Sequence, residues 1–232
     1  MKKTTVLSAI VATMVFSHSA EAQGKFNFRL GGSFPLGEFA EDDINNDEAG
    51  GAAPGFAAGM TYLLPLSSIE AGNQLDLSLG IDLHYSGLQD DVQDDLRRDY
   101  ISSTGLFIVE LDYWQYFNIP LTIGLHYGYQ SSKGFGTFLD AGLSFNILRL
   151  SDYKVTTGFF TTTMKFDQGT SLGVKIGGGL SLNEHMSVGL HYYALGQPSY
   201  DYRITNNINF DLTEGTVKQR VQIVALTLGV TF

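Results

Sequence analysis

The stretch of sequence that decides the fold is the last nine residues, Val224-Ala225-Leu226-Thr227-Leu228-Gly229-Val230-Thr231-Phe232. Every second residue is apolar, and the residues between them are small or carry a hydroxyl. A period of two places alternate side chains on opposite faces of an extended strand. The segment is therefore predicted to be a β-strand with one apolar face and one small or polar face.

Seven upstream segments repeat this alternation of apolar with small or polar residues. They are residues 26–36, 56–62, 75–85, 117–127, 138–147, 171–182 and 186–193. Their density of glycine and β-branched residues is unfavourable for helices. The 27 glycines, 16 Phe and 12 Tyr of the chain suit strands with tight turns and interfacial rings. The sequence thus predicts eight strands.

The connections between these segments alternate strictly between short and long. The short ones are about 65–74, 128–134 and 183–185, and the long polar ones are 38–50, 89–112, 148–169 and 196–220. Membrane barrels have short periplasmic turns and longer outer loops, whereas a Greek-key sandwich gives no reason for such alternation. We therefore predict an all-β fold, an eight-stranded antiparallel up-and-down transmembrane β-barrel. An even strand count places both termini on the periplasmic side.

The first 22 residues have the three parts of a secretory signal peptide. Lys2 and Lys3 give a positive start, Val6–Phe16 is apolar, and Ala20-Glu21-Ala22 offers small residues for cleavage. The apolar run is shorter than the roughly 20 residues of a membrane-spanning helix. We expect residues 1–22 to be removed and residues 23–232 to form the barrel in the outer membrane of a Gram-negative cell. The alternative is an N-terminal helix kept in the fold.

Composition excludes several classes of function. The chain has no cysteine, so it can form neither disulfides nor thiol zinc sites. Its formal charge of −10 argues against nucleic acid as a partner, because binding to phosphates rewards basic surfaces. The glycine run Gly173–Gly179 lies inside a predicted strand and lacks the spacing of a phosphate-binding loop. No cofactor is expected.

If the apolar face of each strand meets lipid, the opposite face must fill the lumen. Eight strands leave an interior just wide enough for side chains. Buried charges are costly alone, so we expect a polar network that plugs the lumen. The alternative is a narrow path for ions or small polar solutes. The predicted members are Arg29, Asp76, Asp82, His84, Asn118, His126, Asp140, Asn146, Lys175 and His191.

Aromatic residues occur at strand ends, where a membrane-interface girdle is expected. We place Phe26, Phe28, Tyr127 and Phe232 at the periplasmic rim. The outer rim is assigned Phe34, Phe56, Tyr85, Tyr113, Phe117 and Tyr192. The C-terminal Phe232, preceded by alternating apolar residues, is similar to the signal that the outer-membrane assembly machinery recognises. That machinery is an expected partner.

Two short motifs suggest a family. They are Gly31-Gly32-Ser33-Phe34-Pro35-Leu36-Gly37-Glu38-Phe39 and Tyr116-Phe117-Asn118-Ile119-Pro120-Leu121. With them, the mature chain resembles the small outer-membrane β-barrel families typical of Bacteroidetes, including the group described as PorT-like. The resemblance implies the barrel fold and an outer-membrane location. It brings no catalytic residues, because members of these families are mostly of unassigned function.

The first two outer loops are acidic. The first contains residues 38–43 with Asp47 and Glu48. The second contains Asp90, Asp91, Asp94, Asp95 and Asp99, interrupted by Arg97 and Arg98. Clustered carboxylates suit hard cations, so these loops could hold divalent cations or bridge through them to lipopolysaccharide. They could also contact an extracellular ligand, or simply be solvated. No EF-hand spacing is present, and no metal-binding residues are assigned.

Three functions are consistent with such a barrel. The first is a structural or adhesive role through the outer loops, and the second is a narrow porin-like channel. The third, a lipid-modifying enzyme, needs a nucleophile and a base that reach lipid. His84 and Ser86 both have inward parity, and Ser102 and Ser103 have no histidine close in sequence. We therefore expect that the protein is not an enzyme.

Overall fold

The structure, a computed structural model, describes residues 24–43, 46, 49–69, 72–105, 110–131, 134–158, 160–206 and 213–232. The predicted leader, residues 1–22, lies outside the described residues, and so do Asp47 and Glu48 of the first acidic loop. In the described part of the chain, thirteen strands join into one antiparallel sheet. No helix in these ranges is long and apolar enough to cross a membrane.

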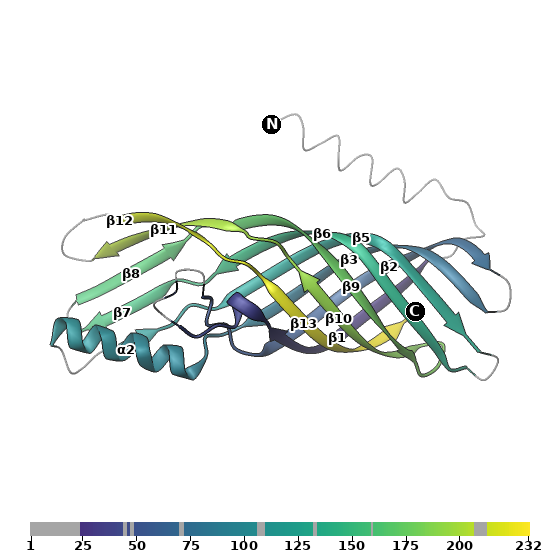
Figure 1. The fold of residues 1–232 in the computed structure, drawn as a ribbon, viewed down its shortest axis with the longest axis horizontal. Helices are drawn as coiled ribbons and strands as arrows, with labels where there is room; N and C mark the ends of the chain where they lie inside the picture. Colours follow the sequence, from purple (N-terminus) through teal and green to yellow (C-terminus); the bar gives the residue numbers. More distant parts are fainter. Residues whose placement is uncertain are drawn as a thin grey trace, which may run out of the picture.

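Eight of the described strands form a closed barrel in which each strand pairs with its neighbours in sequence (Figure 1). They are β1 (Lys25–Pro35), β2 (Gly55–Ile69), β3 (Asn73–Ser86), β5 (Tyr116–Gln130), β6 (Gly136–Leu150), β9 (Gly169–Ser181), β10 (Met186–Ala194) and β13 (Gln222–Thr231). The last strand closes on the first, with Leu228 opposite Leu30. The eight strands and the up-and-down order predicted from the alternation are confirmed.

The barrel wall separates the two sets of side chains that the alternation defined. Outward residues are strongly exposed, among them Leu143 at 66% and Leu172 at 78%. Inward residues such as Asp82 and His191 are buried. A continuous apolar exterior of this size is unfavourable in water and matches the lipid-facing band of a transmembrane barrel. The transmembrane barrel fold predicted from the sequence is therefore confirmed.

Two of the three turns at one end of the barrel are shorter than the alternation indicated. We expected a connection over residues 65–74, but β2 continues to Ile69 and β3 begins at Asn73. The apolar–polar alternation breaks there because the register of the two strands shifts between Pro65 and Ser67. A bulge adds one residue to a strand and so reverses the parity of the residues beyond it. Likewise, β5 continues to Gln130 and β6 begins at Gly136, so this turn is also short.

The long polar connections contain helices and strands that were not predicted from the sequence. They contain η1 (Gly37–Phe39), α2 (Asp90–Thr104), β4 (Glu110–Asp112), β7 (Tyr153–Thr157), β8 (Phe160–Phe166), β11 (Ser199–Asn206) and β12 (Thr213–Lys218). We call these elements the outer head. Figure 1 shows them at the end of the barrel away from the C-terminus. The strands β4, β7, β8, β11 and β12 extend the barrel sheet beyond the apolar band.

The helix α2 is fixed to the outer head by its apolar residues and its ends. Val92 is buried, and Leu96 packs on the same cluster. Tyr113 Oη donates a hydrogen bond to the carbonyl of Gln93 at 2.8 Å. The helix ends at Gly105, whose φ of 69° is the left-handed conformation that terminates many helices. Asp90–Thr104 is therefore a helix that packs on the apolar cluster of the outer head.

The aromatic rims are largely as expected, with one exception. At the turn end, Phe28 contacts Phe232 with ring centroids 6.1 Å apart, and at the other end Tyr85 contacts Phe117 at 5.4 Å. Tyr113, however, stacks on Tyr153 inside the outer head. Its position was wrong because the segment before β5 leaves the barrel wall to join β4 and α2.

Candidate functional site

The candidate site is the barrel lumen, where polar residues from most strands meet. Large polar side chains stand opposite glycines on neighbouring strands, which leave the room they need. A Cβ added to Gly59 would collide with Asp82, and one added to Gly177 would collide with His191. The lumen is therefore filled by large polar side chains, and glycines on the neighbouring strands leave the space for them.

Asp82 is the centre of the polar cluster that lies nearer the loop end of the barrel. Its Oδ1 accepts a hydrogen bond from Arg29 Nη2 at 2.8 Å, and its Oδ2 lies 3.1 Å from Lys175 Nζ. Tyr193 Oη donates to the same Oδ2 at 3.0 Å, and Lys175 also lies over the Tyr193 ring, 5.2 Å from its centroid. All four residues are buried. Charge-assisted hydrogen bonds from β1, β9 and β10 thus converge on a residue of β3.

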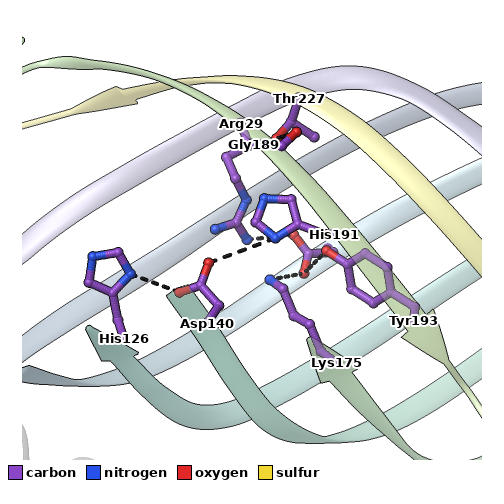
Figure 2. A network of polar contacts seen from close by, with 9 residues as sticks. Arg29, His126, Asp140, Lys175, Gly189, His191, Tyr193 and Thr227 are labelled. Atoms are coloured by element: carbon purple, nitrogen blue, oxygen red, sulfur yellow. Dashed lines mark hydrogen bonds and ion pairs between the residues drawn. The ribbon is translucent and has the colours of Figure 1, made fainter. Parts of the chain in front are cut away.

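Asp140 is the centre of a second cluster nearer the turn end. His126 Nδ1 lies 2.7 Å from Asp140 Oδ1, and His191 Nδ1 lies 3.7 Å from Asp140 Oδ2. Figure 2 shows Asp140 between the two imidazoles, with Lys175 and Tyr193 pointing into the same space. Phe138 packs near both histidine rings, with centroid distances of 5.6 and 6.2 Å. This cluster links β5, β6 and β10.

The other four predicted lumen residues lie outside these two clusters, although all are buried. His84 Nδ1 lies 3.3 Å from Ser33 Oγ, and Asn146 Nδ2 donates to Asn118 Oδ1 at 3.0 Å. Asp76 accepts a hydrogen bond from Gln74 Nε2 at 2.6 Å. The structure therefore divides the ten predicted residues into two clusters, each centred on an aspartate, and three smaller contacts.

A water-accessible cavity opens at the turn end of the lumen. We call this cavity of about 130 Å³ the vestibule. Its wall includes Arg29, Thr61, Asp76, His126 and Asp140. A second cavity of about 10 Å³, bounded by Arg29, Thr61, Asp140 and Lys175, is just large enough for one water molecule. Water can thus enter the part of the lumen nearer the turn end from that end of the barrel.

The opposite end of the lumen is closed by apolar side chains, which we call the outer core. Phe39 of η1, Leu148, Leu195, Val221 and Ile223 are each 0% exposed. Phe39 lies edge-on to Tyr116 at 5.0 Å, and Tyr116 Oη donates to the carbonyl of Gly50 at 2.6 Å. The outer core separates the polar clusters from the loop end.

The acidic residues of the loops lie on the surface of the outer head. Asp90, Asp91, Asp94 and Asp99 are exposed on α2, and the contact between Arg98 and Asp95 joins residues one turn apart. Among the described residues, no group of three His, Cys, Asp or Glu side chains could hold a metal ion.

The serines considered for catalysis lie far from lipid or from a base. Ser86 is buried in the lumen, on the same face of β3 as His84. The Ser102 and Ser103 hydroxyls donate to carbonyls one turn earlier in α2. Gly173–Gly179 lies within β9, as its alternation indicated.

Sequence reasoning missed Tyr193 and the polar hydroxyls Thr61 and Ser144. Their inward parity was visible in the alternation, but only charged, amide and imidazole side chains were taken as members of the predicted network. Position on the face, more than residue type, was the signal that could have identified Tyr193 as a partner for a lumen charge.

The comparisons with known proteins agree with this architecture. No family model matches the chain, and no curated protein sequence is similar to it. Among solved structures, a major outer membrane protein from Thermus thermophilus is similar with a TM-score of 0.50 and 13% identity, over 90% of this chain and 98% of that one. OprG from Pseudomonas aeruginosa has a TM-score of 0.47 and 14% identity, over 91% and 97% of the two chains. Neisserial surface protein A has a TM-score of 0.44 and 13% identity, over 91% and 98%.

These likenesses concern the fold alone, because the identities are low. The class that the fold and lumen define is a small transmembrane β-barrel with a filled interior.

Proposed function

We propose that this chain is an integral outer-membrane protein of a Gram-negative cell, with a closed lumen and a binding or adhesive outer head. The apolar exterior and the predicted signal peptide support the location. The two motifs in β1 and β5 support membership of the Bacteroidetes barrel families, PorT-like proteins included. In this orientation the short turns and Phe232 face the periplasm, and the outer head faces the medium.

The observation that carries the closed lumen is the outer core. Phe39, Leu148, Leu195 and Val221 are fully buried across the loop end of the barrel. Below them Asp82 is held from three other strands. A solute crossing the barrel would have to displace both layers. A packed apolar core has few voids larger than a water molecule, so it supports a closed state.

The outer head supports binding because it is ordered and presents charge on a fixed scaffold. Exposed carboxylates on α2 lie on a helix whose other face packs on the outer core. We propose that this acidic surface contacts an extracellular ligand, or lipopolysaccharide through divalent cations. A catalytic role is not proposed, since the lumen offers no nucleophile with a base open to lipid.

Conductance in a planar lipid bilayer tests the closed lumen. The purified protein, first checked for heat-modifiable migration on a gel, should insert and remain electrically silent. The double variant Phe39→Ala, Leu148→Ala, which opens only the outer core, should remain silent too, because the layer around Asp82 still closes the lumen. Discrete salt-dependent steps in the unmodified protein that change in Lys175→Ala would establish a narrow channel and refute the closed lumen.

The acidic surface is tested with lipopolysaccharide micelles as the probe. Binding should require Ca²⁺ and should weaken when Asp91 and Asp94 are changed to Asn. These two positions are preferred to a loop deletion, because Val92 and Leu96 between and beside them pack on the outer core. Binding that is equal with and without Ca²⁺ would reject the bridging role.

A further inference from the structure

One strand of the outer head has an unpaired edge. β12 pairs with β11, and in the part of the chain that the structure describes it pairs with no other strand. Four of its six residues are exposed and the other two are half-buried. An exposed edge carries backbone N–H and C=O groups that no ladder satisfies, so it is a template for pairing with another strand.

A hydrogen bond at the base of β12 determines which residues present that edge. Gln219 donates its backbone N–H to the carbonyl of Pro198, the residue before β11, at 3.1 Å. Backbone groups alternate between the two sides of a strand, so the odd-numbered residues of β12 bond to β11. The N–H and C=O groups of Glu214, Thr216 and Lys218 therefore point to the unpaired edge.

The charges along this edge are arranged symmetrically. Glu214 and Lys218 lie two residues before and two residues after Thr216, and all three side chains are exposed on one face of the strand. When two copies of β12 pair antiparallel about Thr216, Glu214 of each copy lies directly opposite Lys218 of the other. Opposite charges at such positions stabilise an antiparallel pair, and like charges destabilise it. The edge therefore disfavours a partner with the same order of charges and favours the reversed order.

The backbone fits the same register. Thr216 of one copy then pairs with Thr216 of the second copy, and Glu214 pairs with Lys218 on either side. All three pairs join residues whose backbone groups point to the edge, so each pair can form two hydrogen bonds. A register shifted by one residue would oppose these groups to residues that already bond to β11. Charge and backbone hydrogen bonding are thus satisfied by one arrangement.

We propose that β12 is a homotypic adhesive edge, at which two copies of this chain in facing membranes pair antiparallel about a two-fold axis. β12 runs along the length of the molecule in the outer head (Figure 1), and its Lys218 end is the one that returns to the barrel. An antiparallel partner therefore points its barrel the opposite way. Barrels inserted in one membrane share a direction, so the contact joins two membranes. The inference rests on the proposed function, in which the outer head faces the medium, and names the partner of that head.

A single contact of this kind is weak, because it joins one short exposed strand from each copy. Strength comes from the number of contacts. Once a first contact holds two membranes together, further copies meet at a high effective concentration. Such an edge suits adhesion between surfaces better than a stable dimer in solution.

Clustering of vesicles that contain the purified protein tests the contact. The vesicles are made of phospholipid without lipopolysaccharide and are kept in EDTA, which removes bridging through divalent cations. We expect them to cluster, as measured by light scattering. Glu214→Lys and Lys218→Glu should each reduce clustering about tenfold or more, because each turns two opposite-charge pairs into like-charge pairs. Vesicles of one variant mixed with vesicles of the other should cluster again, since the paired charges are then opposite.

Proline at the centre of the edge tests the backbone contact. Thr216→Pro removes an N–H that points to the edge and leaves the bonds to β11 intact, so it should abolish clustering. Thr216→Val keeps this N–H and is the matched control, which should cluster like the unmodified protein.

Cysteine at the same position tests the register. In a hydrogen-bonded antiparallel pair the two Cα atoms lie about 5.5 Å apart, which a disulfide can span. Because the chain has no cysteine of its own, Thr216→Cys should give a disulfide-linked dimer on oxidation of clustered vesicles. Thr213→Cys should not, since Thr213 lies opposite Gln219 in this register.

Each outcome has a separate meaning. Labelling of Thr216→Cys with a membrane-impermeant maleimide first establishes that the outer head faces outward. Vesicles that do not cluster, or that cluster equally with Thr216→Pro, would refute the contact, and a mixture of the charge-reversal variants that stays dispersed would refute the register. Disulfide dimers formed within single vesicles would put both copies in one membrane and refute the facing arrangement. A silent barrel without clustering refutes this inference alone, whereas a conducting barrel refutes only the closed lumen.

Discussion

The phenol of Tyr193 donates a hydrogen bond to Asp82 Oδ2 at 3.0 Å across the lumen and so joins β10 to β3. These two strands are separated around the barrel by β13, β1 and β2 on one side and by β5, β6 and β9 on the other. The contact therefore braces the wall across its diameter, in addition to the backbone ladder around its circumference. Arg29 and Lys175 add two more braces to the same carboxylate.

Asp82→Asn should destabilise the barrel strongly. The change leaves Arg29 and Lys175 buried without their counter-ion, and breaking a buried pair in this way costs about 3–5 kcal/mol. Tyr193→Phe should cost less, about 1–3 kcal/mol, because it removes one hydrogen bond to a charged group. Urea unfolding in lipid vesicles measures both. Glu214→Gln breaks only an exposed pair and should be within about 1 kcal/mol of the unmodified protein. An Asp82→Asn variant as stable as this control would contradict the brace.

Gly177→Ala should destabilise the barrel by about 1–3 kcal/mol, the usual cost of forcing an extra methyl into a packed interior. The new Cβ would overlap His191, which is fully buried beside Asp140. Gly87→Ala is the control, since a Cβ there has no atom within 4 Å. Unfolding of the two variants in the same vesicles gives the comparison. Equal stability would mean that His191 can move aside freely.

Leu143→Arg should reduce membrane insertion. Leu143 is 66% exposed and lies between the outward residues Ile123 and Val174 of the neighbouring strands. A cation near the bilayer midplane of a barrel costs about 2–4 kcal/mol. Thr163→Arg, on β8 of the outer head, is the control and should insert normally. The folded fraction on a heat-modifiability gel reports the result. Full insertion of Leu143→Arg would place the apolar band outside the membrane.

Tyr153 should titrate late. Burial, aided by Tyr113 and Tyr100, raises the pKa of its phenol from 10.0 to about 12. The folded state therefore holds this proton more tightly than the unfolded chain does. The resulting stability is fully present below pH 10.0 and is lost as the pH rises toward 12. Ultraviolet titration of the folded protein against Tyr153→Phe checks it, and a phenol that ionises at its ordinary pH would show that the outer head is open to water at β7.

The barrel strands could be predicted because one physical cause, lipid on one face and a narrow interior on the other, acts along their whole length. The helix α2 could have been found from Val92, Leu96 and Tyr100, which recur every four residues after a first turn that begins with Asp90 and Asp91. Its acidic residues drew the interpretation toward a solvated loop instead.

The pairing inside the lumen was beyond the sequence for a different reason. Parity identifies Asp82, Lys175 and Tyr193 as inward, but partners are set by the stagger of eight tilted strands. Lys175 and Asp82 are 93 residues apart in sequence, and their strands, β9 and β3, are not paired in the sheet. Asp76 and Asp140 are both inward carboxylates flanking His126 in the strand register, yet only Asp140 contacts it.

The placement of glycines beside large polar side chains constrains how the interior of this barrel can change. Gly59 makes room for Asp82, and Gly177 makes room for His191. A side chain gained at either glycine needs a smaller residue across the ladder, so substitutions in the lumen should be inherited in linked pairs. The outer wall is less constrained, because most apolar side chains there meet fluid lipid, although a Cβ on Gly178 would come within 2.9 Å of the Leu139 side chain. Within one strand, the inward positions should therefore change more slowly in evolution than the outward positions that alternate with them.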